Sequence, residues 1–218
     1  MKTSFRIILI AFAAALVLGG MLIPARPAMA ATISAATSGN WSSASTWIGG
    51  VVPGSADTVN IGAGITVTVD TPSAACSALN LAPGATGTAT LSFNSGSVLS
   101  TGTLTIGGSN SKRRGSIDMT SGGALVISST VTITQTGGTW TPGTGTVNFS
   151  GTQTLPTSWM LTYNNLTISG SGTKTISTGI TVNGILSMQD TAPLSTSGTL
   201  TYGSAATLQY NTSSARTA

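Results

Sequence analysis

The chain has 218 residues, of which 6% are charged, 40% are hydrophobic and 5% are aromatic. It contains 39 threonines, 30 serines and 28 glycines, but no histidine and no glutamate. The apolar content excludes the class of chains that stay disordered because they combine few apolar residues with a high net charge. A chain of this length forms one domain or two and buries a sizeable core.

The missing residue types exclude most familiar catalytic and metal-binding sites. Histidine is the usual metal ligand and the usual general base near neutral pH. A Ser/His/Asp triad, a Cys/His dyad, a histidine zinc site and a pair of glutamates across a glycosidic bond therefore cannot be built from this chain. The remaining candidates are Asp57, Asp70, Asp118, Asp190 and Cys76. The sequence predicts no enzymatic activity, no cofactor and no metal site.

The first thirty residues have the three zones of a secretory signal peptide. Lys2 and Arg6 precede a long apolar run, which ends in small residues at Ala28 and Ala30. This order predicts a signal helix over residues 1–30, export, and cleavage after Ala30. The alternative is an uncleaved membrane anchor, because the apolar run is close to the ~18 residues at which a helix can span a bilayer. We expect an extracellular or cell-surface protein that makes no membrane contact after cleavage.

Removal of the signal peptide leaves a nearly neutral chain. Five cations then stand against four aspartates, which gives a net charge of +1. Only Lys112-Arg113-Arg114 form a basic cluster, and they lie in the turn-forming stretch GGSNSKRRGS, so we interpret them as part of a solvated loop. A nucleic-acid partner would require a clustered basic face, so none is predicted.

Cys76 is the only cysteine, so the chain has no intramolecular disulfide. Its neighbours in SAACSALNLA are small and apolar. This context predicts a buried, unreactive thiol that packs as a small hydrophobic group. An intermolecular disulfide is the alternative.

After residue 50 the sequence repeats short segments in which apolar residues alternate with threonine or serine, each followed by Gly, Ser or Asn. Such alternation places the apolar side chains on one face of a strand and the hydroxyls on the other. No window after residue 30 shows a helical period, so the mature chain is predicted to be all-β. The expected strands begin at residues 57, 65, 89, 102, 124, 130, 145, 165, 174, 180 and 198.

The strand centres recur about every 10 to 13 residues, which fits either a sandwich of hairpins or a solenoid of stacked coils. Sandwiches depend on aromatic cores. In a solenoid each coil is covered by its neighbours, so aliphatic and threonine ladders suffice, with small residues at the corners. The low aromatic content favours the solenoid. We predict a right-handed parallel β-helix, because parallel strand connections are overwhelmingly of that hand.

The predicted organisation has three parts: a signal peptide at 1–30, a capping segment at 31–56 and solenoid repeats at 57–218. Trp140 and Trp159 lie near prolines 142 and 156. We expect an interruption of the repeat at 137–162, either a looped-out excursion or a boundary between two solenoid halves. The apolar residues expected to stack along the coil axis are Leu104, Ile106, Leu166, Ile168, Ile176, Ile180, Val182, Leu200 and Tyr202.

Two tryptophans in the capping segment, Trp41 and Trp47, are the candidate site residues. They are followed by turn signals at Gly49-Gly50 and Pro53-Gly54. The end of a solenoid exposes its core, so a bulky aromatic lid is one interpretation of the pair. The alternative is a platform on which a sugar stacks.

The segment GNWSSASTWIGGVVPGSADTVNIGAGITVTVD at 39–70 resembles the opening of secreted bacterial β-strand-repeat surface proteins of the filamentous-haemagglutinin-like type. The run YNNLTISGSGTKTISTGITVNGILSM at 163–188 is similar to the internal repeats of the same proteins. The resemblance implies an extracellular parallel β-helix used for adhesion, surface structure or matrix.

These observations favour a cell-surface or matrix structural protein or adhesin, with end-to-end self-association into filaments as a sharper version. Its expected partners are further copies of the chain and surface glycans. A carbohydrate-binding module and a β-helix enzyme acting on polysaccharide are the alternatives, since fold does not decide activity. In the enzyme alternative, Asp118 near Lys112–Arg114 is the least implausible cluster. Thr-x-Thr units such as Thr66/Thr68 raise binding to ice or crystalline polysaccharide as a third class, provided that the units align on one flat face.

Overall fold

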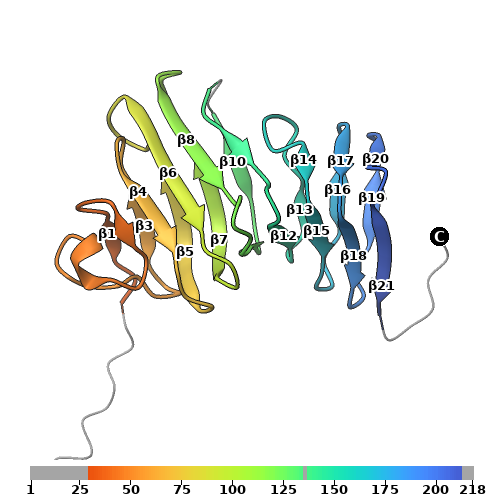
Figure 1. Cartoon of the computed structure of the whole chain (residues 1–218), viewed down its shortest axis with the longest axis horizontal. Coiled ribbons are helices and arrows are strands. Elements are labelled where there is room, and N and C mark those ends of the chain that lie inside the picture. Colours follow the sequence, from red (N-terminus) through yellow and green to blue (C-terminus); the bar gives the residue numbers. More distant parts are fainter. Residues whose placement is uncertain (1–28, 135–136, 213–218) are drawn as a thin grey trace, which may run out of the picture.

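The computed structural model describes residues 29–134 and 137–212, so the predicted signal peptide lies almost entirely outside the described residues. The described chain forms an all-β parallel solenoid of about eight turns (Figure 1), which confirms the predicted solenoid architecture. The 3-10 helix η1 (Ala44–Thr46) is the only helix among the described residues. Within this part of the chain no helix is long and apolar enough to cross a membrane.

One sheet runs the whole length of the stack. Its strands pair in parallel in the order β1-β3-β5-β7-β9-β12-β15-β18-β21, and β10 also pairs with β7. The members of this long sheet are β1 (Thr32–Ser34), β3 (Thr58–Ile61), β5 (Ala74–Leu81), β7 (Val98–Ile106), β9 (Ala124–Ile127), β10 (Val131–Ile133), β12 (Thr146–Phe149), β15 (Asn165–Ile168), β18 (Ile185–Gln189) and β21 (Thr207–Asn211).

Three shorter sheets complete the walls of the solenoid. The first has the order β11-β8-β6-β4-β2, with β2 (Gly39–Asn40), β4 (Thr66–Val69), β6 (Gly87–Phe93), β8 (Arg113–Asp118) and β11 (Trp140–Thr141). The second has the order β13-β16-β19, with β13 (Gln153–Thr154), β16 (Lys174–Ile176) and β19 (Leu194–Thr196). The third has the order β14-β17-β20, with β14 (Thr162–Tyr163), β17 (Ile180–Val182) and β20 (Leu200–Tyr202).

Apolar ladders hold successive turns together. Partner positions in the long sheet are separated by one full turn, from 19 residues between Val147 and Leu166 to 27 between Leu104 and Val131. Each turn therefore contains two or three strands, which accounts for the shorter spacing expected from the sequence. One apolar ladder runs through Leu99, Leu125, Val147, Leu166, Leu186 and Leu208, and its members from Leu99 to Leu186 are at most 2% exposed.

Polar side chains form ladders of their own outside the core. Asn80 Nδ2 donates a hydrogen bond of 2.9 Å to Asn60 Oδ1 in the previous turn. The hydroxyls of Thr68 and Ser92 form another bond of 2.9 Å between turns. Successive side chains of a strand point to opposite faces of the sheet. The inward apolar side chains therefore contact the next turn in the core, and the outward hydroxyl or amide side chains contact it on the surface.

The sheets are not continuous where the turn β9-β10-β11 meets the turn β12-β13-β14. The two turns are offset by 22 residues, and β9 pairs with β12 in that register. On the other two walls the pairing stops: β10 does not pair with β13, and β11 does not pair with β14. We call this level the junction. Strands pair across it on only one wall of the solenoid, the wall of β9 and β12.

Every expected strand has a counterpart in the structure, and ten of the 21 described strands were not among those expected. The strand β5 is built largely from small residues around Cys76, and β8 begins at Arg113, inside the stretch interpreted as a loop. The interpretation of Lys112-Arg113-Arg114 as one loop was therefore wrong for the two arginines. The reason is register: β8 pairs with β6, with Arg113 opposite Gly87 and Arg114 opposite Thr88. The other strands that were not expected are β1, β2, β11, β13, β14, β18, β19 and β21.

A glycine is required at the corner between β11 and β12. Gly143 has φ +48°, in the left-handed region that side chains rarely adopt. A Cβ at this position would also overlap the backbone of Met119 and Thr120 in the previous turn. The close approach of the two corners therefore depends on the absence of a side chain.

The apolar ladder yields the first prediction. Replacing Leu125 with alanine should lower the free energy of unfolding by about 2–5 kcal/mol, because the side chain is fully buried between two turns. Leu208→Ala is the matched control, since Leu208 belongs to the same ladder but is 43% exposed; its loss should be under about 1 kcal/mol. Denaturant unfolding monitored by circular dichroism measures both, and equal losses would contradict a core carried by the ladder.

Candidate functional site

Trp41 and Trp47 lie in the core at the N-terminal end of the solenoid, with exposed fractions of 1% and 2%. Their ring centroids are 5.1 Å apart in an edge-to-face arrangement, and Trp47 Nε1 donates a 2.8 Å hydrogen bond to the Trp41 carbonyl. A sugar-stacking platform needs an open ring face. Neither ring offers one in this structure, and the burial favours their interpretation as capping residues.

The segment that carries these tryptophans also closes the edge of the first strand. The Ile48 amide donates to the Ser34 carbonyl and the Ala36 amide donates to the Thr46 carbonyl, at 2.9 and 2.8 Å. Between these bonds Ala35 and Trp47 form an antiparallel bridge. The chain thus folds back beside the end of β1, so the two tryptophans cover the core here and the bridge covers the strand edge from Ser34 to Ala36. We call this segment, residues 35–48, the lid.

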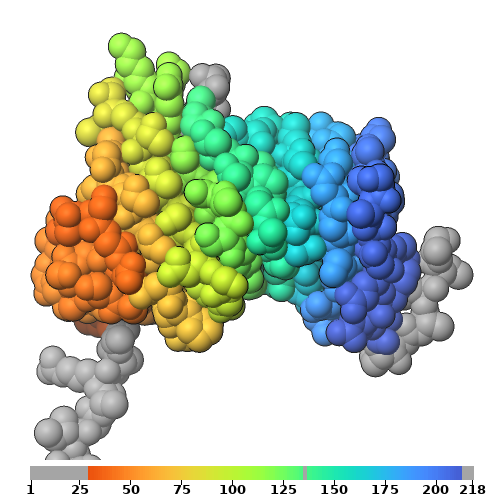
Figure 2. Space-filling model, viewed as in Figure 1, coloured from red at the N-terminus to blue at the C-terminus, as the bar shows by residue number. Residues whose placement is uncertain are grey.

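The opposite end is formed by β19, β20 and β21 and has no comparable cover among the described residues. Leu208 and Tyr210 continue the ladders of Leu186 and Met188, yet they are 43% and 46% exposed. Tyr202 continues the ladder of Val182 and is 45% exposed. Leu200 and Tyr202 were expected in axial stacks; they are in register with the turn before, but no described strand covers their other side. Figure 2 shows the lid and β21 at opposite ends of the stack.

The four aspartates hold corners of the coil. Asp57 accepts hydrogen bonds from the Ala31 and Gly54 amides, at 2.9 and 2.8 Å. Asp70 accepts bonds from the amide and hydroxyl of Ser42, at 3.0 and 2.6 Å. These contacts fasten the lid and the first turn to the turn that follows.

The remaining two aspartates act in the same way farther along the stack. Asp118 accepts bonds from the amide and hydroxyl of Thr120, at 2.9 and 2.5 Å, and Asp190 accepts a 2.9 Å bond from the Gly170 amide of the previous turn. Within residues 29–134 and 137–212, no three Asp or Cys side chains form a group that could hold a metal ion. Each carboxylate has partners in its own turn or the adjacent one, and the structure does not bring the four together.

The basic cluster is divided between a turn and a strand. Lys112 ends the turn after β7, and the Arg113 guanidinium donates a 3.1 Å hydrogen bond to the Pro83 carbonyl and a 3.4 Å bond to the Ser109 hydroxyl. Asp118 lies at the far end of β8 from Arg113. The structure therefore separates the Asp118 carboxylate from the cations that the sequence placed near it.

The Thr-x-Thr units do not gather on one face. Thr66 and Thr90 pair in the sheet of β4 and β6, Thr105 pairs with Thr132 in the long sheet, and Thr181 pairs with Thr201 in the sheet of β17 and β20. The units are thus spread over different walls of the solenoid. A flat threonine face for an ordered surface would require one wall to carry them.

No role for Lys174 was predicted from the sequence. Its side chain is fully buried at a corner, where Nζ donates hydrogen bonds to the carbonyls of Ser169, Gly172 and Ser150, the last two at 2.8 and 3.4 Å. Burial lowers the pKa of the Lys174 ammonium below its ordinary value, and the Asp190 carboxylate opposes this shift. The cation links carbonyl groups of two turns, and its role became visible only once the turns were in register.

Cys76 is 4% exposed, and its thiol donates a 3.4 Å hydrogen bond to the Thr101 hydroxyl. Burial raises the pKa of the Cys76 thiol to about 11; the hydrogen bond with Thr101 opposes this rise, and the Asp57 carboxylate adds to it. The thiolate is the reactive form of cysteine. The Cys76 sulfur is thus buried, as the sequence predicted.

Comparison with models of protein families, with curated proteins and with solved structures finds no match. The resemblance to filamentous-haemagglutinin-like surface proteins therefore rests on the quoted sequence segments and on the parallel solenoid itself.

The buried lysine yields a prediction about stability. Lys174→Met should lower the free energy of unfolding by about 2 kcal/mol or more, because each buried carbonyl left without a donor costs about 1–3 kcal/mol. Lys112→Met serves as the control on an exposed turn, with an expected change within about 0.5 kcal/mol. Denaturant titration measures both variants. A wild-type stability for Lys174→Met would show that water replaces the ammonium at no cost.

The cysteine yields a prediction about reactivity. Near pH 8 the folded chain should react with an aromatic disulfide reagent about a hundredfold more slowly than the unfolded chain, because a pKa near 11 instead of 9.0 reduces the thiolate fraction by that factor. A Cys76→Ser, Ser100→Cys double variant moves the thiol to an exposed neighbouring position and should react at the rate of the unfolded chain. Fast modification of native wild-type protein would mean that the Cys76 thiol is accessible.

Proposed function

We propose that this chain is a structural or adhesive protein of the cell surface or extracellular matrix, and that it associates through the end formed by β19, β20 and β21. The signal-peptide pattern of residues 1–30 supports export. A stack of parallel turns, each hydrogen-bonded to the next, supports a stiff body whose function is mechanical.

The observation that carries the proposal is the difference between the two ends. The lid covers the core and the backbone edge at the N-terminal end. At the other end β21 has a partner strand on one side, and Leu208 and Tyr210 expose apolar surface beside its free edge. An exposed, flat strand edge of this kind is a template for pairing with another chain.

The strand β21 also carries no feature that discourages pairing. Its residues, TLQYN, include no charge and no proline, whereas protected edges commonly use Lys, Pro or a bulge. Because the lid occupies the other end, copies of the chain would meet through their β21 ends about a two-fold axis. Such a contact is self-complementary and closes at a dimer, so longer filaments would need the lid to open.

Sedimentation tests this proposal. The chain without residues 1–30 should show a concentration-dependent dimer, and the double change Leu208→Lys, Tyr210→Lys should weaken dimerisation about tenfold or more, because four like charges would face one another at the contact. Val51→Lys is the control, since Val51 is a 57% exposed apolar residue that follows the lid, away from β21. It should leave the dimer unchanged.

A chain that stays monomeric at all accessible concentrations would contradict the association, as would a dimer that is insensitive to the double change. Circular dichroism of each variant shows that the solenoid is intact, because β21 is exposed and contributes little to the core.

A further inference from the structure

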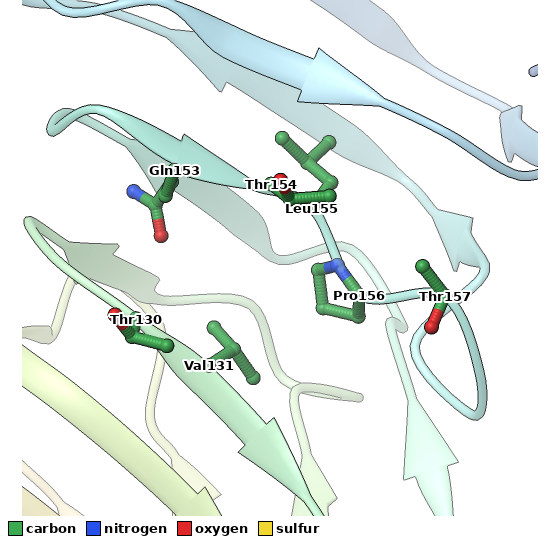
Figure 3. Close-up of a pocket in the computed structure, with 7 residues that line it drawn as sticks. All are labelled: Thr130, Val131, Gln153, Thr154, Leu155, Pro156 and Thr157. Carbon is green, nitrogen blue, oxygen red and sulfur yellow. The ribbon is translucent and has the colours of Figure 1, made fainter. Parts of the chain in front are cut away.

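At the junction, two walls lack strand pairing between the turns β9-β10-β11 and β12-β13-β14. These two walls differ in which groups lie between the turns. On the wall of β11 and β14, aromatic side chains replace the missing ladder. Trp140 Nε1 donates a 2.5 Å hydrogen bond to the Thr162 carbonyl, and the Trp140 ring lies 6.2 Å from that of Trp159 and 6.1 Å from that of Tyr163. On the wall of β10 and β13 no such group intervenes, and a cleft of about 400 Å³ separates the two strands (Figure 3).

This cleft contains a buried polar atom without a partner. Gln153 is 8% exposed, and its Nε2 donates a 2.9 Å hydrogen bond to the Ile127 carbonyl. That bond fixes the orientation of the amide, because the reverse orientation would place two acceptor oxygens together. Gln153 Oε1 has no hydrogen-bond partner, and Figure 3 shows it directed toward the strand that carries Thr130 and Val131. A buried acceptor left unpaired costs about 1–3 kcal/mol, which a donor in the cleft would recover.

The two strands that bound the cleft also present unpaired backbone edges. On β10, Thr130 and Thr134 bond to β7 through the Leu104 amide and the Ile106 carbonyl. On β13, the amides of Gln153 and Leu155 bond to the turn of β16. Backbone groups of alternate residues in a strand point to opposite sides, so those of Val131, Ile133 and Thr154 face the cleft.

The chemistry of the cleft is therefore that of two strand edges without a partner strand on this side, with one extra acceptor between them. Its walls are uncharged: Thr130 and Thr154 contribute hydroxyls, and Val131, Leu155 and Pro156 contribute apolar surface. The volume lies within the range of ligand sites, about 300–1,000 Å³. No carboxylate lines the cleft, as a hard cation would favour, and no aromatic ring does, as a sugar stack would favour.

We propose that this cleft binds an extended, uncharged peptide segment, which inserts between β10 and β13 as an additional parallel or antiparallel strand. The main chain of the segment pairs with the free groups of Val131 and Ile133 on one side and of Thr154 on the other. A Ser, Thr, Asn or Gln side chain of the segment donates to Gln153 Oε1. Strand addition of this kind obtains its affinity from main-chain hydrogen bonds and its selectivity from alternate side chains.

This site is independent of the association through β21, because the cleft lies in the middle of the stack. Changes at Gln153 should therefore leave the dimer intact, and changes at Leu208 and Tyr210 should leave peptide binding intact. Failure of one proposal is then distinguishable from failure of the other.

Peptide titration with a hydrogen-exchange readout tests the proposal on the purified chain. The probe is a blocked pentapeptide, Thr-Val-Asn-Val-Thr, labelled with a fluorophore at its amino end. In the free chain the amides of Val131, Ile133 and Thr154 should exchange as unpaired groups. Saturation with the peptide should slow the exchange of these amides and leave amides of the lid and of β21 unchanged.

Two variants and one control locate the binding. Gln153→Leu should weaken peptide binding about tenfold or more, since it removes the acceptor and retains the volume. Thr154→Pro should do the same, because proline removes a main-chain donor on the open edge without removing a bond to β16. Gln189→Leu makes the same chemical change on β18, away from the cleft, and should bind the peptide as the wild type does.

Three results would overturn the proposal. The first is protection of Val131 and Thr154 amides in the free chain, which would mean that β10 and β13 pair directly. The second is no binding up to about 1 mM peptide. The third is binding of a neutral cello-oligosaccharide, lost in Gln153→Leu, in place of the peptide, which would assign the cleft to a glycan.

Discussion

The structure depends on the pairing of main-chain groups between successive turns. Within a turn the strands make few hydrogen bonds to one another, so each turn is completed by the turns before and after it. Any level at which this pairing stops leaves a row of unsatisfied donors and acceptors. There are three such levels in the described chain: the first strand, the junction and the last strand. The proposed sites lie at those levels because there a described strand lacks a neighbouring strand on one side.

The three levels differ in how far the core and the strand edges are covered. At the first strand an antiparallel bridge through Ala35 and Trp47 supplies the missing partner, and two tryptophans cover the core. At the junction one wall is paired, one is filled by Trp140, Trp159 and Tyr163, and one holds a cleft. At the last strand the apolar ladders end in partly exposed side chains. The described residues therefore cover the core less completely from the N-terminal lid toward β21.

The unusual composition follows from the same constraint. Stacked turns supply one another with apolar contacts, so a core of Val, Leu and Ile suffices and few aromatic residues are needed outside the lid and the junction. Corners bring main-chain groups of neighbouring turns close together, as at Gly143, where a side chain would overlap the previous turn. Charged side chains are then needed chiefly at corners where a main-chain amide or carbonyl group has no main-chain hydrogen-bond partner. Asp57 bonds to two such amides and Lys174 to three such carbonyls.

Much of the fold could be predicted from the sequence, because alternation of apolar and hydroxyl residues reports which face of a strand is inside. It identified β3, β4 and most later strands, together with their inward residues. It did not identify β5, where small residues weaken the alternation, or β8, where two arginines at the start of the strand suggested a loop. The prolines and tryptophans pointed to an interruption at 137–162, but neither the wall on which the ladder is lost at the junction nor the position of Lys174 could be predicted, because both depend on which residues of different turns are adjacent. A residue step of 19 in one turn and 26 in another cannot be read from a degenerate repeat.

The low charge of the chain determines how its free edges select partners. Because only 6% of the residues are charged, long-range electrostatic steering contributes little to encounter. Recognition must then come from short-range fit: apolar side chains at β21 and main-chain groups in the cleft. Such contacts are weakly sensitive to salt, because little of their free energy is Coulombic. In the extracellular setting proposed above, ionic strength varies, and interfaces made from strand edges and apolar ladders would retain their affinity under that variation.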